Sequence, residues 1–182
     1  MRIPVTFSLV LAASLAGATS APADSAPEQL VYLIATEAIC GGAAGCPGEA
    51  IADNGDLIEL SGQGVLTLNP KSAVGGGVFT HSFAAGGSMT GTWTAIQLLS
   101  FKSYGPSPLL PPSFEAGDAL ILVHLVDSET GLGGDAILRV GCILPQVKLP
   151  PATFEGIRLS VMGGVNFNKE TQPRATLFIR QQ

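Results

Sequence analysis

The segment that decides the fold reads Val-Phe-Thr-His-Ser-Phe at residues 78–83, Ala-Ala-Gly-Gly at 84–87 and Ser-Met-Thr-Gly-Thr-Trp-Thr-Ala at 88–95. Residues of different polarity alternate on both sides of a short glycine-bearing loop, and a period of two residues is that of a β-strand. The segment therefore predicts a β-hairpin. Phe79, His81 and Trp93 fall on aromatic faces, whereas the opposite faces carry hydroxyls, so we expect the aromatic side on a core and the threonines toward water.

Strand-like runs continue on both sides of this hairpin. Its second strand extends through Ile96 to Tyr104, a proline-rich loop follows at 105–112, and Asn54-Gly55 predicts a type I′ turn before a strand that begins at Leu57. The runs at 119–126 and 136–144 are apolar at nearly every position and predict central strands buried on both faces. Further strands are expected at Gln29–Thr36, Val65–Leu68, Ile157–Met162 and Ala175–Ile179.

Composition supports the same fold class. The chain has 23 glycines, 46% apolar residues and only 13% charged residues, which favours short strands joined by glycine turns over a helical bundle or a disordered chain. We therefore expect an all-β protein, a single antiparallel β-barrel or β-sandwich of about eight strands.

The first residues have the features of a secretory signal peptide. Met1-Arg2 supplies a basic start, an apolar run covers 3–16, and small residues permit cleavage after Ala18 or Ala23. We expect residues 1–23 to be this signal and residues 24–182 to form one β domain that is secreted or periplasmic. The apolar run is shorter than the roughly 20 residues of a membrane-spanning helix, so no stable membrane insertion is expected.

Charge limits the partners. The formal net charge is −5, and removal of Arg2 with the signal makes it −6. Because phosphate backbones repel an acidic protein, no nucleic-acid partner is expected. The partner classes that this leaves are a small molecule and another protein.

Three cysteines are present in a chain expected outside the cytoplasm, where disulfides persist. Cys40 and Cys46 flank a flexible glycine-rich segment and can form a disulfide, while the alternative pairs one of them with Cys142. A structural zinc site needs four ligands, usually with closely spaced cysteine pairs that are missing here, so no metal site is expected. The glycine clusters lack the lysine and helix context of phosphate loops, and no cofactor is expected.

Polar residues in strand-like runs are the candidate site residues. His124 interrupts an apolar strand, where an imidazole needs a partner or a cavity, and Arg139 lies on the presumed neighbouring strand. Trp93 and Tyr104 are candidates for an aromatic wall around a ligand, and His81 lies between two phenylalanines. For each residue the common alternative is a structural role in the core.

Three kinds of function remain open. We expect non-enzymatic ligand binding or protein interaction, because no sequence motif fixes a reaction. The alternative is a small β-barrel enzyme, an isomerase, cyclase or hydrolase, in which an inward-facing His124 is the acid-base group and Glu155 an acid beside it. A third possibility is a cell-surface or assembly subunit that uses the threonine face and exposed strand edges.

Five short segments carry a resemblance to other proteins. They are Gly-Thr-Trp-Thr-Ala at 91–95, Leu-Leu-Ser-Phe at 98–101, Ser-Tyr-Gly at 103–105, Glu-Gly-Ile-Arg-Leu at 155–159 and Asn-Phe-Asn-Lys-Glu at 166–170. In these segments the chain resembles a group of small exported proteins of unknown function. The resemblance implies export and one β domain, and it implies no activity and no functional residue.

Overall fold

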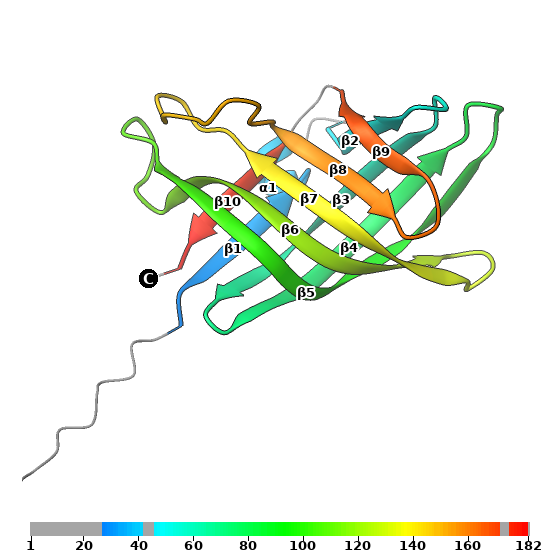
Figure 1. The fold of residues 1–182 in the computed structure, drawn as a ribbon, viewed down its shortest axis with the longest axis horizontal. Helices are drawn as coiled ribbons and strands as arrows, with labels where there is room; N and C mark the ends of the chain where they lie inside the picture. The colour runs from blue at the N-terminus through cyan, green and yellow to red at the C-terminus, as the bar shows by residue number, and fades with distance from the viewer. Residues whose placement is uncertain (1–26, 42–45, 172–174, 182) are drawn as a thin grey trace, which may run out of the picture.

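The computed structural model describes residues 27–41, 46–171 and 175–181, and its strands form one antiparallel sheet that closes on itself (Figure 1). This confirms the all-β prediction. A single short helix, α1, precedes the second strand. In chain order the elements are β1 (Gln29–Ile34), α1 (Glu37–Cys40), β2 (Gly48–Ala52), β3 (Leu57–Leu68), β4 (Lys71–Ser82), β5 (Ser88–Pro106), β6 (Phe114–Asp127), β7 (Gly133–Cys142), β8 (Gly156–Val161), β9 (Asn166–Glu170) and β10 (Thr176–Arg180).

The sheet closes in two different ways along its length. The second half of β3 pairs with β1, whereas its first half pairs with β2. On the other side of the barrel, the start of β6 pairs with β10 and the rest pairs with β7. The strands β3 to β6 are therefore shared by a narrow ring, which β1 and β10 complete, and a wide ring, which β2, β9, β8 and β7 complete.

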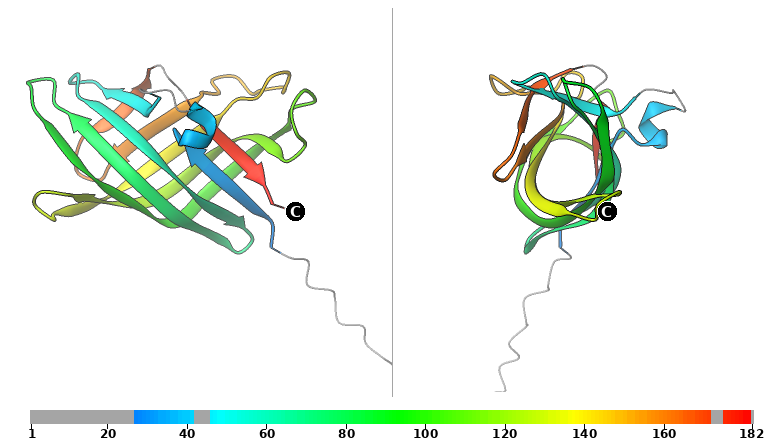
Figure 2. Two further views of the ribbon diagram at one scale, coloured as in Figure 1. Left: turned by 180° about the vertical axis from the view of Figure 1, so that it is seen from behind. Right: turned by 90° about the vertical axis from the view of Figure 1, so that its right-hand side faces the viewer.

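This arrangement gives the barrel two unequal ends. Barrel diameter grows with strand number, so the six-stranded narrow ring encloses less space than the eight-stranded wide ring. The closed sheet is seen end-on in the right view of Figure 2. Each described strand pairs on both sides along at least part of its length, so none presents a complete free edge of the kind that an assembly subunit would use.

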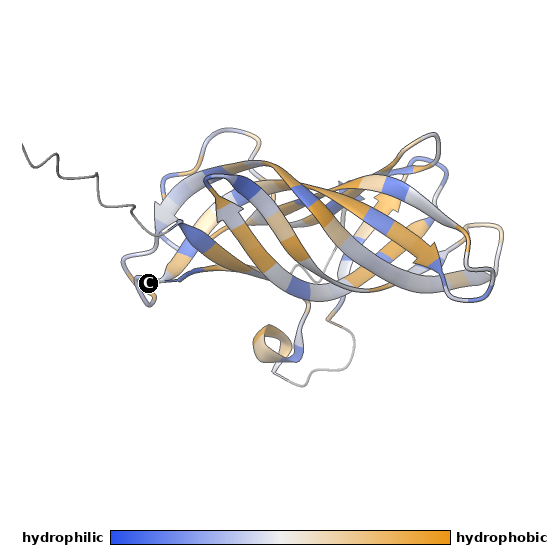
Figure 3. Cartoon of the chain, turned by 90° about the horizontal axis from the view of Figure 1, so that it is seen from below, coloured by the Kyte–Doolittle hydropathy of each residue, from blue (hydrophilic) through white to orange (hydrophobic). Residues whose placement is uncertain are grey.

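The predicted hairpin is confirmed as the paired strands β4 and β5, with Phe79 opposite Gly91 and Ser82 opposite Ser88. Trp93 is 1% exposed and Phe79 is 4% exposed, whereas Thr92 and Thr94 face the solvent. The alternation of polar and apolar positions is visible along the strands in Figure 3. Complete burial of such a side chain stabilises the fold by about 1.5–3 kcal/mol.

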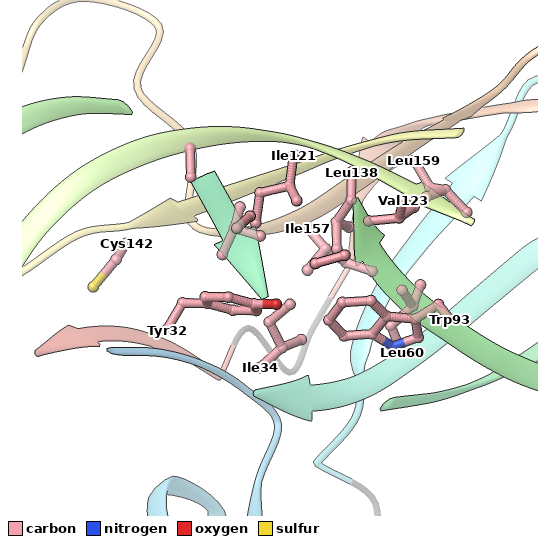
Figure 4. Close-up of a cluster of buried hydrophobic side chains, with 14 of the residues drawn as sticks. Tyr32, Ile34, Leu60, Trp93, Ile121, Val123, Leu138, Cys142, Ile157 and Leu159 are labelled. Atoms are coloured by element: carbon pink, nitrogen blue, oxygen red, sulfur yellow. The ribbon is translucent and has the colours of Figure 1, made fainter. Parts of the chain in front are cut away.

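Two glycines on β3 make room for the largest core rings. A Cβ atom on Gly62 would lie 2.5 Å from Cζ2 of Trp93, and one on Gly64 would lie 2.5 Å from the hydroxyl of Tyr32. The two rings lie 6.3 Å apart at the centre of the core (Figure 4). Because these glycines leave space for the rings, β3 runs unbroken where the sequence suggested two separate strands.

The structure corrects several details of the sequence prediction. Its described residues form ten strands rather than about eight, because β2 and β9 were not expected. The turn at Asn54-Gly55 is not of type I′, since only Gly55 has a positive φ, of 88°, and Ala52 bonds to Asp56 across a three-residue loop. The strands β6 and β7 are not buried on both faces, since their outward side chains are exposed or partly exposed.

The cysteines follow the first of the two predicted pairings. The sulfur atoms of Cys40 and Cys46 lie at bonding distance, and Cys142 is a buried free thiol at the end of β7, so the alternative pairing with Cys142 is not formed. The predicted signal at 1–23 lies outside the described residues. Among the residues that the structure describes, no helix has both the length and the apolar character needed to cross a membrane.

Candidate functional site

A cavity of about 510 Å³ opens at the wide end of the barrel, the end that faces the viewer in the right view of Figure 2. We call it the cup. Its volume lies within the range of about 300–1,000 Å³ that is usual for small-molecule sites. Its wall is mostly apolar and comes from seven strands and two loops: Ile58, Phe79, His81, Met89, Leu125, Asp127, Thr130, Leu132, Gly133, Gly134, Leu159, Val161, Val165 and Phe167.

The cup ends where the side chains of the wide ring fill the barrel. The next inward-facing side chains along β3, β5 and β6 are those of Leu60, Trp93 and Val123, all buried. Within the cup itself, Gly134 faces inward near the start of β7, and a Cβ atom there would meet nothing within 4 Å. The small residue at this position therefore keeps part of the cup open.

The most buried polar group of the cup wall is the imidazole of His81. Its Nε2 lies 3.0 Å from Oδ2 of Asp56, and both side chains are about nine-tenths buried. The imidazole packs edge-on against Phe167, with the ring centres 5.1 Å apart, and lies tilted against Phe83, with the ring centres 4.4 Å apart. The imidazole is thus held in a fixed position between an acid and two aromatic rings.

Asp56 is held as a carboxylate. The backbone N–H of Ala84 donates to its Oδ1 at 2.9 Å, and this bond, together with that from His81, keeps the pKa of the Asp56 carboxyl below its ordinary value. Register explains why the acid and the histidine meet. His81 lies opposite Ile58 in the hairpin of β3 and β4, and Asp56 comes two residues before Ile58, so Asp56 and His81 are diagonal neighbours on the same face.

Asp127, at the end of β6, is the acid among the described residues that line the cup. Its Oδ1 accepts hydrogen bonds from the backbone N–H groups of Glu129 and Thr130 and from the hydroxyl of Thr130. The bonds from Thr130 lower the pKa of the Asp127 carboxyl most, so Asp127 is ionised at neutral pH. Among the described residues no lysine or arginine lines the cup, and Lys169 near the mouth forms an exposed ion pair with Asp53.

Of the five predicted binding residues, only His81 lines the cup. Trp93 lies in the core beneath it and donates its indole N–H to the carbonyl of Ser61 at 3.1 Å. Tyr104 lies near the narrow end, with the ammonium of Lys102 5.6 Å from its ring centre.

The other two predicted residues lie on the outer surface of the barrel. The prediction that His124 faces the interior is wrong: its side chain is 46% exposed, and Nδ1 lies 2.7 Å from Oδ1 of Asp135 on β7. This neighbour satisfies the imidazole outside the barrel. Arg139 also points outward, where its guanidinium pairs with Asp118 and covers the ring of Phe154.

The structure does not bring His124 and Glu155 together. Glu155 accepts hydrogen bonds from the backbone N–H of Ile143 and the hydroxyl of Thr176, near the other end of β7. His124 lies opposite Asp135 on β7, and Glu155 lies beside Gly141 on the same strand. These two positions of β7 are six residues apart, which corresponds to about 20 Å at roughly 3.3 Å per residue. The predicted acid-base pair is therefore not formed.

Sequence analysis missed Asp56 and Asp127. The sequence does contain a signal for Asp56. If two strands pair in a hairpin that turns at Asn69-Pro70, their register places Asp56 diagonally opposite His81.

Across residues 27–41, 46–171 and 175–181, no group of three His, Cys, Asp or Glu side chains is placed to hold a metal ion. Comparisons of the chain with models of protein families, with curated proteins and with solved structures found no match.

Proposed function

We propose that this protein binds a small, largely apolar molecule in the cup. The observation that carries the proposal is an open apolar cavity of about 510 Å³ whose wall contains the buried imidazole of His81, oriented by its bond to Asp56. Small-molecule sites combine these two features, since apolar walls supply affinity and a few fixed polar groups supply orientation.

The apolar wall of the cup also supports this proposal. Water needs polar partners, and few are present on a wall built from residues such as Met89, Leu125 and Val161. Displacing such poorly bound water with apolar groups is favourable. Leu132 is 75% exposed in the loop beside the cup and is available to cover a bound molecule.

The test is a titration of the purified protein with N-phenyl-1-naphthylamine, a neutral dye that fluoresces in apolar surroundings. We expect saturable binding of one dye per chain in the micromolar range, because a few hundred Å² of buried apolar surface at about 25 cal/mol/Å² offsets the cost of association. Backbone amide NMR shifts then locate the dye. Shifts concentrated at the cup support the proposal, whereas shifts in β1 and β10, or a dye that does not saturate, overturn it.

Acid-base catalysis is a second candidate, favoured by the geometry of His81 and Asp56. In this scheme His81 replaces His124 as the proton acceptor: Nδ1 takes a proton from carbon beside a carbonyl and returns it to a second carbon, so a β,γ-unsaturated ketone becomes its conjugated isomer. The described residues of the cup wall include no lysine or arginine for the oxyanion that forms, and the hydroxyl of Thr130 already bonds to Asp127. Binding is therefore the favoured function. Absorbance of the conjugated product, compared between the wild type and His81→Gln, tests the catalytic scheme.

We also propose that the chain is exported. The basic, apolar and small-residue pattern of residues 1–23 and the bond between Cys40 and Cys46 support this, since disulfides persist in oxidising compartments. Mass spectrometry of the protein recovered from its host is expected to give Thr19 or Asp24 as the first residue. Recovery with Met1-Arg2 still attached would contradict export through this signal.

A further inference from the structure

Two side chains that line the cup offer hydrogen-bond acceptors: the imidazole of His81 in its neutral form and the carboxylate of Asp127. Asp56 is ionised and can only accept, so the proton of the bond to His81 is carried by Nε2. In the neutral imidazole this leaves Nδ1 without a proton, and a nitrogen without a proton accepts. Within the described part of the chain, Nδ1 has no hydrogen-bond partner.

Asp127 adds a second acceptor. Its Oδ1 is occupied by the bonds from Glu129 and Thr130, whereas Oδ2 has no partner among the described residues. Other carboxylates near the mouth include Asp53, which pairs with Lys169, and Asp135, which pairs with His124. Within the part of the chain that the structure describes, the cup wall contains no lysine or arginine to pair with a negative charge.

We infer that the ligand of the cup combines an apolar body with a hydrogen-bond-donating head group, a hydroxyl or an ammonium, and that an apolar carboxylate is excluded. The inference rests on the proposed binding function. A donor satisfies Nδ1 of His81, whereas a ligand that covers this nitrogen without donating to it leaves an acceptor unpaired, which is costly. A carboxylate instead brings a further negative charge beside Asp127 on the cup wall and near Asp56, the partner of His81.

The test is displacement of bound N-phenyl-1-naphthylamine by four ligands with linear apolar chains and matched overall length. They are 1-decanol, decylammonium, decanoate and 1-methoxynonane, which is an ether of equal length that accepts but does not donate. We expect 1-decanol or decylammonium to displace the dye at concentrations at least tenfold lower than either decanoate or the ether. The ratio between alcohol and ammonium shows whether the head is neutral or charged.

Two variants assign the preference to its atoms. His81→Phe keeps a flat ring and removes both nitrogens, so the advantage of decanol over the ether is expected to disappear. Asp127→Asn removes a charge at the mouth, so decanoate is expected to improve at least threefold; because Asp127 lies in a surface turn, this variant keeps the test available if His81→Phe does not fold. Equal or stronger displacement by decanoate or the ether in the wild type overturns the inference while dye binding stands. Failure of the dye to bind overturns the proposed function itself.

Discussion

Filling the cup from its wall is the most direct perturbation of the proposed site. Gly134 faces inward on β7, its φ is not in the left-handed region, and a Cβ atom there meets nothing within 4 Å. A larger side chain at this position therefore enters the cup without displacing the backbone. We predict that Gly134→Ala, Gly134→Leu and Gly134→Trp weaken dye binding in that order.

The magnitudes follow from the wall area that each side chain covers. A leucine side chain withdraws about 60 Å² of apolar wall from the ligand, which at about 25 cal/mol/Å² is roughly 1.5 kcal/mol, or about tenfold in the dissociation constant. The indole of tryptophan covers about twice as much and gives roughly a hundredfold loss.

Stability is expected to move in the opposite direction. Glycine in a strand interior costs about 0.5–1 kcal/mol relative to alanine, and leucine adds apolar surface that is partly buried in the cup. Gly134→Leu should therefore unfold in urea with a free energy about 1 kcal/mol higher than that of the wild type. A variant that is more stable and binds less distinguishes a blocked cup from a damaged fold.

Thr92→Leu is the matched control, because Thr92 is exposed on the outer face of β5. It introduces the same side chain outside the barrel and should leave the affinity for N-phenyl-1-naphthylamine unchanged. A folded Gly134→Trp protein that binds the dye as tightly as the wild type would refute the placement of the ligand in the cup.

Three further predictions concern individual side chains. His124→Ala should leave dye affinity unchanged and alter the free energy of unfolding by less than about 1 kcal/mol, because the pair with Asp135 is exposed; a tenfold loss of affinity in the titration would contradict this. Cys142 should react with a thiol reagent only after unfolding, since burial and then the charge of Glu155 raise its pKa to about 12. Because the unfolded thiol ionises near pH 8.5, the wild type should lose about 1.4 kcal/mol of stability per pH unit above that value relative to Cys142→Ala, and equal slopes in urea titrations would be the contrary result. Asp56 has a lowered pKa in the folded state, so its contribution is present above the ordinary carboxyl pKa and is lost as the pH falls through the folded value; Asp56→Asn should reduce the fall in melting temperature between pH 5 and pH 2.

The fold class could be predicted from the sequence because alternation is a local property. Residues 78–95 contain a complete hairpin with its turn, and the face that carries Phe79 and Trp93 is the buried one. Two strands were missed for a physical reason as well. In β9 Phe167 is the single apolar residue, and β2 begins at a glycine and is built mainly from small side chains, so neither has a clear period of two.

The site was harder to predict because it depends on pairs that are distant in sequence. The expectation for His124 failed because Asp135, 11 residues later, satisfies it on the outside of the barrel. An apolar strand does not reveal such a neighbour. His81 was selected for its place between phenylalanines, but its partner Asp56 lies 25 residues earlier and is recognised only through the register of β3 and β4.

The tapered wall separates two tasks within one small domain. Side chains of the core close the barrel toward its six-stranded end, while the loops at 53–55, 83–87 and 128–132 border the eight-stranded end and lie apart from that closure. These loops can therefore be exchanged without disturbing the six-stranded end of the barrel, because they do not enter its packed core. The protein is therefore suited to directed evolution in which the loops are varied to obtain new ligand preferences while the core of the barrel is left unchanged.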